Sequence, residues 1–408
     1  MSEGEITGVD AAGRWRGAGV AGAAIGIIAT GAAVGVAVER LTVGRGMRRK
    51  ARLALDATAP YGTLRGTAGK AVAEDGTELY YEVDEVDDPA AADAPAPRRR
   101  LFGGAARPQA EPVTVIFSHG YCLGQDAWHF QRAALRGAVR TVFWDQRSHG
   151  RSGRGVAQRD REAPVSIDLL GRDLKAVIDA AAPEGPLVLV GHSMGGMTMM
   201  ALAAQYPELV AERVVGAAFL GTSSGLIAEL TYGLPVVGGL NVASRVLPGV
   251  FRLMTAQAAL VERGRRATAD LFAGLIKRYS FGSRDVDPAL ARFAERLIEA
   301  TPVEIVAEFY PALAAHDKVE ALCAFDHMPV LVLAGERDLM TPSEHSEAIA
   351  AALPDAELVL VQGAGHLVML EDPGTVDEHL AGVLAAAGAG EAARGIEQRR
   401  AAGARRHG

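Results

Sequence analysis

Cysteine is almost absent from this sequence: the chain contains only Cys122 and Cys323. Two isolated cysteines make neither a disulfide framework nor a thiolate metal site, because both need several cysteines at regular spacings. Such scarcity is typical of a reducing compartment. Aromatic residues are also scarce, at 5% of the chain. We therefore expect alanine, valine and leucine to fill most of the core.

An excess of positive charge is lacking as well. The formal net charge is −7, and lysine and arginine form no basic stripe within the globular part of the sequence. Proteins that bind nucleic acid neutralise its phosphates with clustered lysine and arginine. The composition therefore favours no nucleic-acid partner.

One long uncharged run lies near the N-terminus, at residues 17–38 within an N-terminal segment 1–60. As a helix it is long enough to cross a hydrocarbon core of ~30 Å. Basic residues are more frequent after the run, at residues 40–52, than before it, which predicts that the rest of the chain stays on the cytoplasmic side. The alternative is an Ala/Gly-rich helix that packs on the domain or on a partner. We expect the protein at the cytoplasmic face of the membrane, or in the cytoplasm.

The first part of a core domain is predicted at residues 61–220. Residues 71–74 and 78–83 flank Asp75-Gly76, a two-residue turn typical of a β-hairpin. Residues 84–112 then lose all periodicity and are rich in proline, alanine and arginine, which predicts a flexible surface insertion.

From residue 113 onward, short apolar runs alternate with helical patterns. The runs fall at residues 113–117, 141–144, 187–190, 214–220, 329–334 and 357–361. The helical patterns include residues 166–182 and 195–205. Continuous Val/Leu runs between helices predict an α/β fold with a mostly parallel, doubly wound sheet, preceded by the antiparallel hairpin. Ligands bind such sheets beyond the carboxyl ends of the strands.

The strand rhythm stops between residues 221 and 328, where the pattern is mostly helical. A helical insertion at this edge predicts a cap, or lid, placed before the strand that carries the acid described below. Residues 329–387 form the second part of the core. Residues 388–408, rich in Ala, Gly and Arg, predict a disordered tail.

The segment Gly191-His192-Ser193-Met194-Gly195 joins an apolar run to a helix. This spacing is typical of a nucleophile elbow, in which glycines permit a turn too tight for side chains. The serine then lies at the positive end of the helix, and the N–H of Met194 faces any oxyanion formed beside it. An ordinary strand–helix turn with a capping serine is the alternative.

A nucleophilic serine needs a base, and the base needs an orienting carboxylate. Asp338 follows the fifth apolar run and His366 follows the sixth, so Ser193, acid and histidine come in the order expected on this fold. Glu336 is the second choice of acid, and Asp145 is a minority alternative. The turn after residue 117 should supply the second oxyanion donor, the N–H of Tyr121.

Three further residues are candidates for the substrate pocket: His119, Trp128 and His192. His119 also fits a structural hydrogen-bonding role better than that of a base. The two cysteines lack metal-ligand spacing, and the chemistry outlined here needs no metal or organic cofactor.

These motifs together resemble the α/β-hydrolase superfamily: SHGYCLG (118–124), FWDQRSHGRS (143–152), VGHSMGG (190–196), LAGERDLMTP (333–342) and GAGHLVMLEDP (363–373). The set is most similar to its lipase/esterase-like and cofactor-free peroxidase-like branches. The resemblance implies Ser193 as nucleophile, His366 as base and Asp338 as acid. One departure is Ser148, where relatives usually carry glycine.

The expected function is a serine hydrolase that cleaves carboxylic esters of small or lipophilic substrates through an acyl-enzyme. Perhydrolysis, C–C bond hydrolysis or acyl transfer with the same triad are alternatives. A non-catalytic ligand-binding protein on the same fold is an alternative of another class. The expected partner is a small-molecule ester, with membrane association through residues 17–38, and the oligomeric state stays open.

Overall fold

A computed structural model describes residues 61–87, 112–159, 164–225, 236–237, 240–241, 278–283 and 285–397. The segment 1–60 with its candidate anchor, most of the 84–112 insertion and a large part of the 221–328 region lie outside the described residues. Within the described part, no helix is both long and apolar enough to cross a bilayer.

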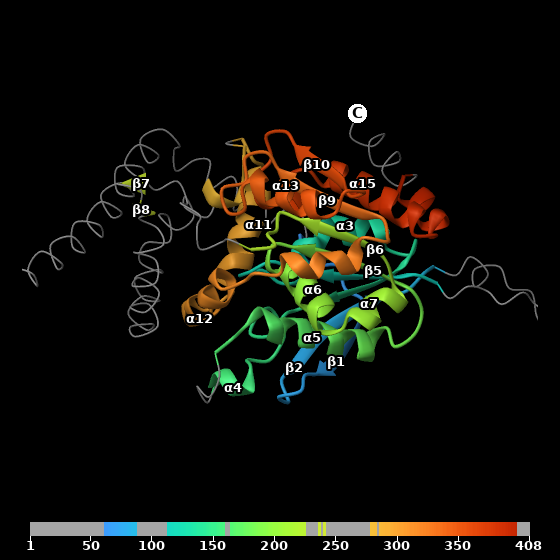
Figure 1. The fold of residues 1–408 in the computed structure, drawn as a ribbon, viewed down its shortest axis with the longest axis horizontal. Coiled ribbons are helices and arrows are strands. Elements are labelled where there is room, and N and C mark those ends of the chain that lie inside the picture. The colour runs from blue at the N-terminus through green and yellow to red at the C-terminus, as the bar shows by residue number, and fades with distance from the viewer. Residues whose placement is uncertain are drawn as a thin grey trace, which may run out of the picture.

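A sheet forms the centre of the described part of the molecule (Figure 1). It has eight strands in the order β1-β2-β4-β3-β5-β6-β9-β10. The antiparallel hairpin consists of β1 (Thr67–Val72) and β2 (Glu78–Asp84), and β2 also pairs antiparallel with β4 (Arg140–Trp144). The remaining strands run parallel to β4: β3 (Thr114–Ser118), β5 (Leu187–His192), β6 (Val214–Leu220), β9 (Val330–Gly335) and β10 (Glu357–Val361). The predicted hairpin and mostly parallel sheet are confirmed.

Helices cover both faces of the sheet, which explains why the parallel strands are continuously apolar. Successive strand residues point to opposite faces: Phe117 lies in one hydrophobic core and Ile116 in the other. The core around Ile116 is closed by α5 (Ile167–Ala181), α6 (Met194–Gln205) and α13 (Ser343–Ala352). The core around Phe117 is closed by α3 (His129–Leu135) and α15 (Pro373–Ala386). Figure 1 shows α5 and α6 on one side of the strands and α15 on the other.

Local signals define the helix boundaries. The side chain of Ser166 accepts a hydrogen bond from Leu169 N and so caps α5, close to the helix predicted over residues 166–182. The remaining elements are η1 (Gln125–Trp128), α4 (Val156–Arg159), α7 (Pro207–Arg213), β7 (Val236–Val237), β8 (Leu240–Asn241), α11 (Pro288–Glu299), α12 (Val303–Ala314), η3 (Val319–Phe325) and α14 (Val368–Glu371).

The inserted cap is shorter than residues 221–328. Lys318 N donates to Ser224 O at 2.7 Å, so the chain leaves and re-enters the core at one place. After that point, Leu322 and Phe325 of η3 are fully buried in the core that contains Ile116. The cap thus branches from the core between Ser224 and Lys318. Its described parts include the helices α11 and α12, in line with the helical pattern, and also the short paired strands β7 and β8, which the pattern did not predict.

Two further boundaries differ from the prediction. Asp84 is the last residue of β2 rather than the start of a loop, because its buried carboxylate pairs with Arg132 at 2.8 Å. Residues 390–397 are helical, not disordered. Ala392, Ala393 and Ile396 recur at helical spacing and are buried in the core around Phe117, which holds this part of the tail in place. Residues 398–408 lie outside the described part.

Candidate active site

Ser193 occupies a sharp turn between β5 and α6. Its φ of 52° and ψ of −119° are unusual for any residue other than glycine, and such strain is typical of a nucleophile elbow. The flanking glycines are needed for space. A Cβ at Gly195 would lie 2.0 Å from Ser118 O, and one at Gly191 would lie 2.6 Å from Gly196 N. Close backbone packing therefore holds Ser193 at the carboxyl end of β5.

Met194 is the first residue of α6. The first N–H groups of a helix have no intrahelical acceptor, and they carry the partial positive charge of the helix dipole. The backbone N–H of Met194 thus has the chemistry expected of an oxyanion donor beside Ser193.

Asp338 and His366 lie at the carboxyl ends of the neighbouring strands β9 and β10. His366 Nδ1 and Asp338 Oδ2 are 2.8 Å apart. The Asp338 side chain is buried, whereas that of His366 remains 12% exposed. A partly buried imidazole held by a buried carboxylate is the arrangement that orients a general base.

The environment of Asp338 keeps its carboxylate ionised. Burial alone would raise its pKa, but the charge and hydrogen bond of His366, together with the N–H groups of Thr341 and Met340, outweigh it and lower the pKa. Met340 N and Thr341 N donate to Oδ1 at 2.7 and 2.9 Å, and Thr341 Oγ1 donates to Oδ2 at 2.9 Å. Thr341 was not among the site residues predicted from the sequence, although an aspartate in a turn often accepts backbone N–H groups shortly after it.

The two rival carboxylates have other roles in the structure. Glu336 is exposed and accepts a hydrogen bond from Gly363 N at 3.1 Å. Asp145 is buried, which raises its pKa, and it accepts N–H groups from Gln125 at 2.7 Å and Arg151 at 2.9 Å. Asp145 therefore braces the loop after β4.

His192 links the serine turn to the histidine loop. Its Nε2 lies 2.9 Å from the backbone oxygen of His366, so this nitrogen must carry the proton and donate. The two imidazole rings lie 4.7 Å apart between centroids. Burial, aided by repulsion from His366, lowers the pKa of His192 to about 3. His192 thus stays neutral and ties the residue before Ser193 to His366.

The other two pocket candidates, His119 and Trp128, are fully buried. His119 Nε2 accepts from Gln146 N at 2.9 Å, and burial lowers its pKa to about 4. The ring of Trp128 packs between Phe117 and His192, at 5.0 and 6.4 Å between centroids. Both residues support the site from beneath.

Tyr121 follows β3 in a loop that passes directly over the elbow. A Cβ at Gly120 would lie 2.6 Å from His192 Nδ1 and 3.1 Å from Ser193 Cβ, so glycine is required for this close approach. Cys122 N donates to His149 Nε2 at 3.2 Å, which holds the loop beyond Tyr121. The backbone of Tyr121 is therefore next to Ser193, as an oxyanion donor must be.

The side chain of Tyr121 contacts the cap. This contact was not predicted from the sequence. Its hydroxyl donates to Val306 O in α12, and its ring stacks on Phe309 at 6.4 Å. Farther out, Arg154 pairs with Glu308 and lies 3.5 Å from Glu304. The cap helix α12 is thus attached to the loops that surround the serine.

An apolar cluster lies between α12, the start of α6 and the start of α5. Its buried members are Val165, Ile167, Leu170, Met194, Met197, Ala201, Ile305, Phe309, Ala312 and Leu313, with Tyr121 packed against them. Among the described residues, no group of three or more His, Cys, Asp or Glu side chains is placed to hold a metal ion.

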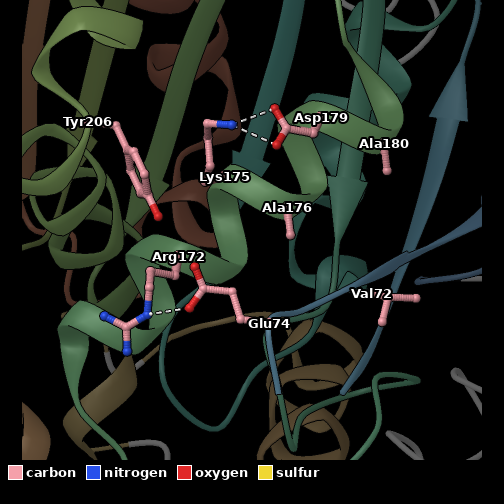
Figure 2. A pocket seen from close by; sticks show the side chains of 8 residues that line it. All are labelled: Val72, Glu74, Arg172, Lys175, Ala176, Asp179, Ala180 and Tyr206. Carbon is pink, nitrogen blue, oxygen red and sulfur yellow. Dashed lines mark hydrogen bonds and ion pairs between the residues drawn. The ribbon is translucent and has the colours of Figure 1, made fainter. Parts of the chain in front are cut away.

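A surface hollow of about 600 Å³ lies elsewhere, lined by Val72, Glu74, Arg172, Lys175, Ala176, Asp179, Ala180 and Tyr206 (Figure 2). Its charges are already paired, since Arg172 contacts Glu74 at 3.3 Å and Lys175 contacts Asp179 at 2.6 Å. None of its residues belongs to the loops that carry Ser193, Asp338 or His366, so the chemistry does not lie there.

A serine on a strained strand–helix turn, an Asp–His pair at adjacent strand ends and a doubly wound sheet together define a hydrolase of the α/β class. The chain belongs to the family described as the alpha/beta hydrolase fold, which it matches over residues 113–373.

Relatives within this family differ in what their names say they act on. A protein from Azorhizobium caulinodans designated a carbamate hydrolase, RutD, is 25% identical over 276 residues, which cover 66% of this chain and 89% of the relative. The dihydrolipoyllysine-residue acetyltransferase component of an acetoin cleaving system from Pseudomonas putida is 25% identical over 339 residues, 80% of each chain. A thermophilic esterase from Thermogutta terrifontis has a TM-score of 0.56 at 22% identity, covering 78% of this chain and 98% of the esterase. At that identity, the structural likeness shows the fold alone.

Proposed function

We propose that this α/β hydrolase cleaves neutral carboxylic esters with lipophilic acyl groups, using Ser193 as nucleophile, His366 as general base and Asp338 as the orienting acid. One observation carries the proposal. The ionised Asp338 holds His366 at 2.8 Å, and the backbone of that same histidine is bonded to His192, the residue before Ser193.

The proposed reaction has two steps. His366 accepts the proton of Ser193 as its Oγ attacks the ester carbonyl, and then returns that proton to the leaving alcohol. Water repeats the cycle on the acyl-enzyme and releases the acid. The N–H groups of Tyr121 and Met194 would stabilise the oxyanion, each by ~3–4 kcal/mol as for other oxyanion donors.

The surroundings favour an uncharged, apolar acyl group. Met194 belongs to the apolar cluster beneath α12, and Tyr121 packs against it, so the proposed oxyanion donors adjoin a buried apolar surface. Burial also keeps His119, His149 and His192 neutral, with pKa values lowered to about 4, 3 and 3. An ionised acyl group placed there would lose its hydration without gaining a counter-charge. The relative designated a carbamate hydrolase supports chemistry at an acyl carbon.

Labelling with a fluorophosphonate probe and hydrolysis of p-nitrophenyl esters of graded chain length test this proposal. We expect the wild-type chain to label and to favour neutral, longer acyl groups. Ser193→Ala should abolish labelling and reduce kcat by at least about 10⁴-fold, because the nucleophile is lost. Ser343→Ala, at the start of α13, is the matched control and should leave both unchanged.

A wild-type chain that neither labels nor hydrolyses any ester of the panel would contradict the proposal and favour a ligand-binding protein. Adding hydrogen peroxide or an alcohol to the same assay tests the alternative acceptors. A peracid or a new ester as the main product would favour perhydrolysis or acyl transfer by the same serine, and a diketone substrate panel tests C–C hydrolysis.

A further inference from the structure

Glu371, the last residue of α14, has a carboxylate that is surrounded by backbone N–H groups. Its Oε1 accepts from Ser283 N at 2.8 Å, and its Oε2 accepts from Gly282 N at 3.1 Å and from Gly365 N at 2.8 Å. Hydrogen bonds to an ionised acceptor are about twice as strong as neutral ones. Three of them converge on this one side chain.

The three donors come from two segments that are far apart in the sequence. Gly365 directly precedes His366, in the loop after β10. Gly282 and Ser283 belong to the cap, in the described segment 278–283 that precedes α11. Glu371 therefore joins the cap to the loop that carries the proposed base.

The two segments also touch directly, backbone against backbone. A Cβ at Gly282 would lie 2.4 Å from Gly363 O, and a Cβ at Gly365 would lie 2.4 Å from Gly282 N. Leu367 N donates to Ser280 O at 2.9 Å on the other side of the histidine. His366 is thus flanked at both neighbours by bonds that lead to the cap or to Glu371. At this packing density, one segment cannot move without the other.

We propose that Glu371 is a positioning residue: it fastens cap segment 280–283 to the histidine loop, so that the seating of the cap sets the orientation of the His366 imidazole. The proposal rests on the proposed function of His366 as the base. It makes the cap part of the machinery that aims the base, in addition to covering the site.

Glu371→Gln tests the proposal, because the amide keeps the shape but places an NH₂ group among N–H donors. Glu336→Gln is the matched control. Glu336 also accepts a backbone N–H from the same loop, at Gly363, but it is exposed. Glu371→Asp keeps the charge on a side chain one methylene shorter, which cannot reach both segments fully.

The first measurement is amide hydrogen exchange around residues 282, 283 and 365, which does not depend on activity. We expect exchange to be about tenfold faster in Glu371→Gln, in line with the loss of one or more charge-assisted hydrogen bonds. Exchange in Glu336→Gln should change only at Gly363. Unchanged exchange at all three residues would overturn the proposed fastening.

The second measurement separates kcat from KM with p-nitrophenyl acetate, a substrate too small to depend on the acyl pocket. We expect kcat to fall about tenfold in Glu371→Gln with KM within about twofold, because a misaimed base slows chemistry rather than binding. Glu371→Asp should be intermediate and takes the place of the glutamine variant if that chain does not fold. A lower melting temperature with unchanged kcat would reduce Glu371 to a structural role. A wild-type chain without esterase activity would contradict the proposed function, while the exchange measurement would still decide whether the cap is fastened.

Discussion

At the scale of single residues, the strained conformation of Ser193 must be held by its neighbours. A residue in this region of φ and ψ costs of order 1–3 kcal/mol. Two hydrogen bonds oppose that cost: Ser193 N donates to Leu220 O at 2.9 Å, and Thr222 Oγ1 donates to Ser193 O at 2.6 Å. Both partners lie at or just beyond the end of β6, so the neighbouring strand maintains the turn.

The identity of the acid is a prediction at this scale. Asp338→Asn should lower kcat by about 10⁴-fold, because an amide at this position selects the wrong tautomer of His366. Glu336→Gln, two residues away and exposed, should change kcat by less than about twofold, as expected for a surface substitution. Steady-state kinetics and the rate of fluorophosphonate labelling measure both variants. A larger loss in the Glu336 variant would identify Glu336 as the acid instead.

Some of the site residues could be predicted from the sequence and others could not. Asp338 and His366 could be found because each follows an apolar run, and strand ends meet at one edge of a parallel sheet. The pocket roles of His119, Trp128 and His192 stay predictions, and the structure shows that all three side chains are fully buried. Glu371 could not be identified, because its partners Gly282 and Gly365 are brought together only by the folded cap.

At the scale of secondary-structure elements, some glycines are required because a neighbouring atom leaves no room for a Cβ, whereas others face open space. Gly382 lies in the interior of α15, where a Cβ would meet no atom within 4 Å. Gly382→Ala should therefore stabilise the protein by about 0.5–1 kcal/mol, the usual difference in helix propensity. Urea denaturation measures this change.

The contrasting variant is Gly195→Ala in α6. Its Cβ would lie 2.0 Å from Ser118 O, a backbone atom that cannot move independently of β3. We expect this variant to be strongly destabilised or displaced at the elbow. Equal stability of the two alanine variants would contradict the close packing of α6 on β3.

The core elements could be predicted from the sequence much better than the cap. Strands covered on both faces leave a continuous apolar run that is visible without any structure. The seat of α12 depends instead on the Tyr121 hydroxyl and on Arg154 with its two glutamates. Residues 390–397 were misjudged because alanine and glycine suggest disorder, although Ile396 with two alanines suffices to bury one side of that helix.

At the scale of the whole molecule, buried neutral histidines make stability depend on pH. Burial, with repulsion from His119, lowers the pKa of His149 from 6.5 to about 3. Between these values the unfolded chain binds a proton that the folded chain does not. The contribution of His149 to the free energy of unfolding is therefore greatest above pH 6.5. It decreases as the pH falls toward 3, by up to about 1.4 kcal/mol per pH unit.

The variant His149→Gln isolates this effect. Asp173, whose pKa is raised to about 6 by burial, acts in the opposite direction, so the comparison must be made between two chains. We expect the free energy of unfolding, measured by urea denaturation from pH 7 to pH 5, to decrease less steeply in His149→Gln. Parallel curves for the two chains would show that His149 binds protons equally in the folded and unfolded states, and would contradict its lowered pKa.

The membrane association of residues 17–38 stays a prediction, which fractionation of cells into membrane and cytosol would measure. Retention of the full chain in the membrane fraction, and its release when residues 1–60 are deleted, is the expected outcome.

The hydrogen bond between Ser224 and Lys318 has a consequence for how such chains diversify. The segment inserted between these two residues begins and ends at one point, so its length places little strain on the sheet. The entropy cost of closing such a loop also depends only weakly on its length. A different segment grafted at these two residues would leave β6 and β9 paired as before. Natural variation or laboratory recombination can thus replace the cap while leaving the core residues around Ser193 intact. Any replacement cap must also present backbone N–H groups to Glu371.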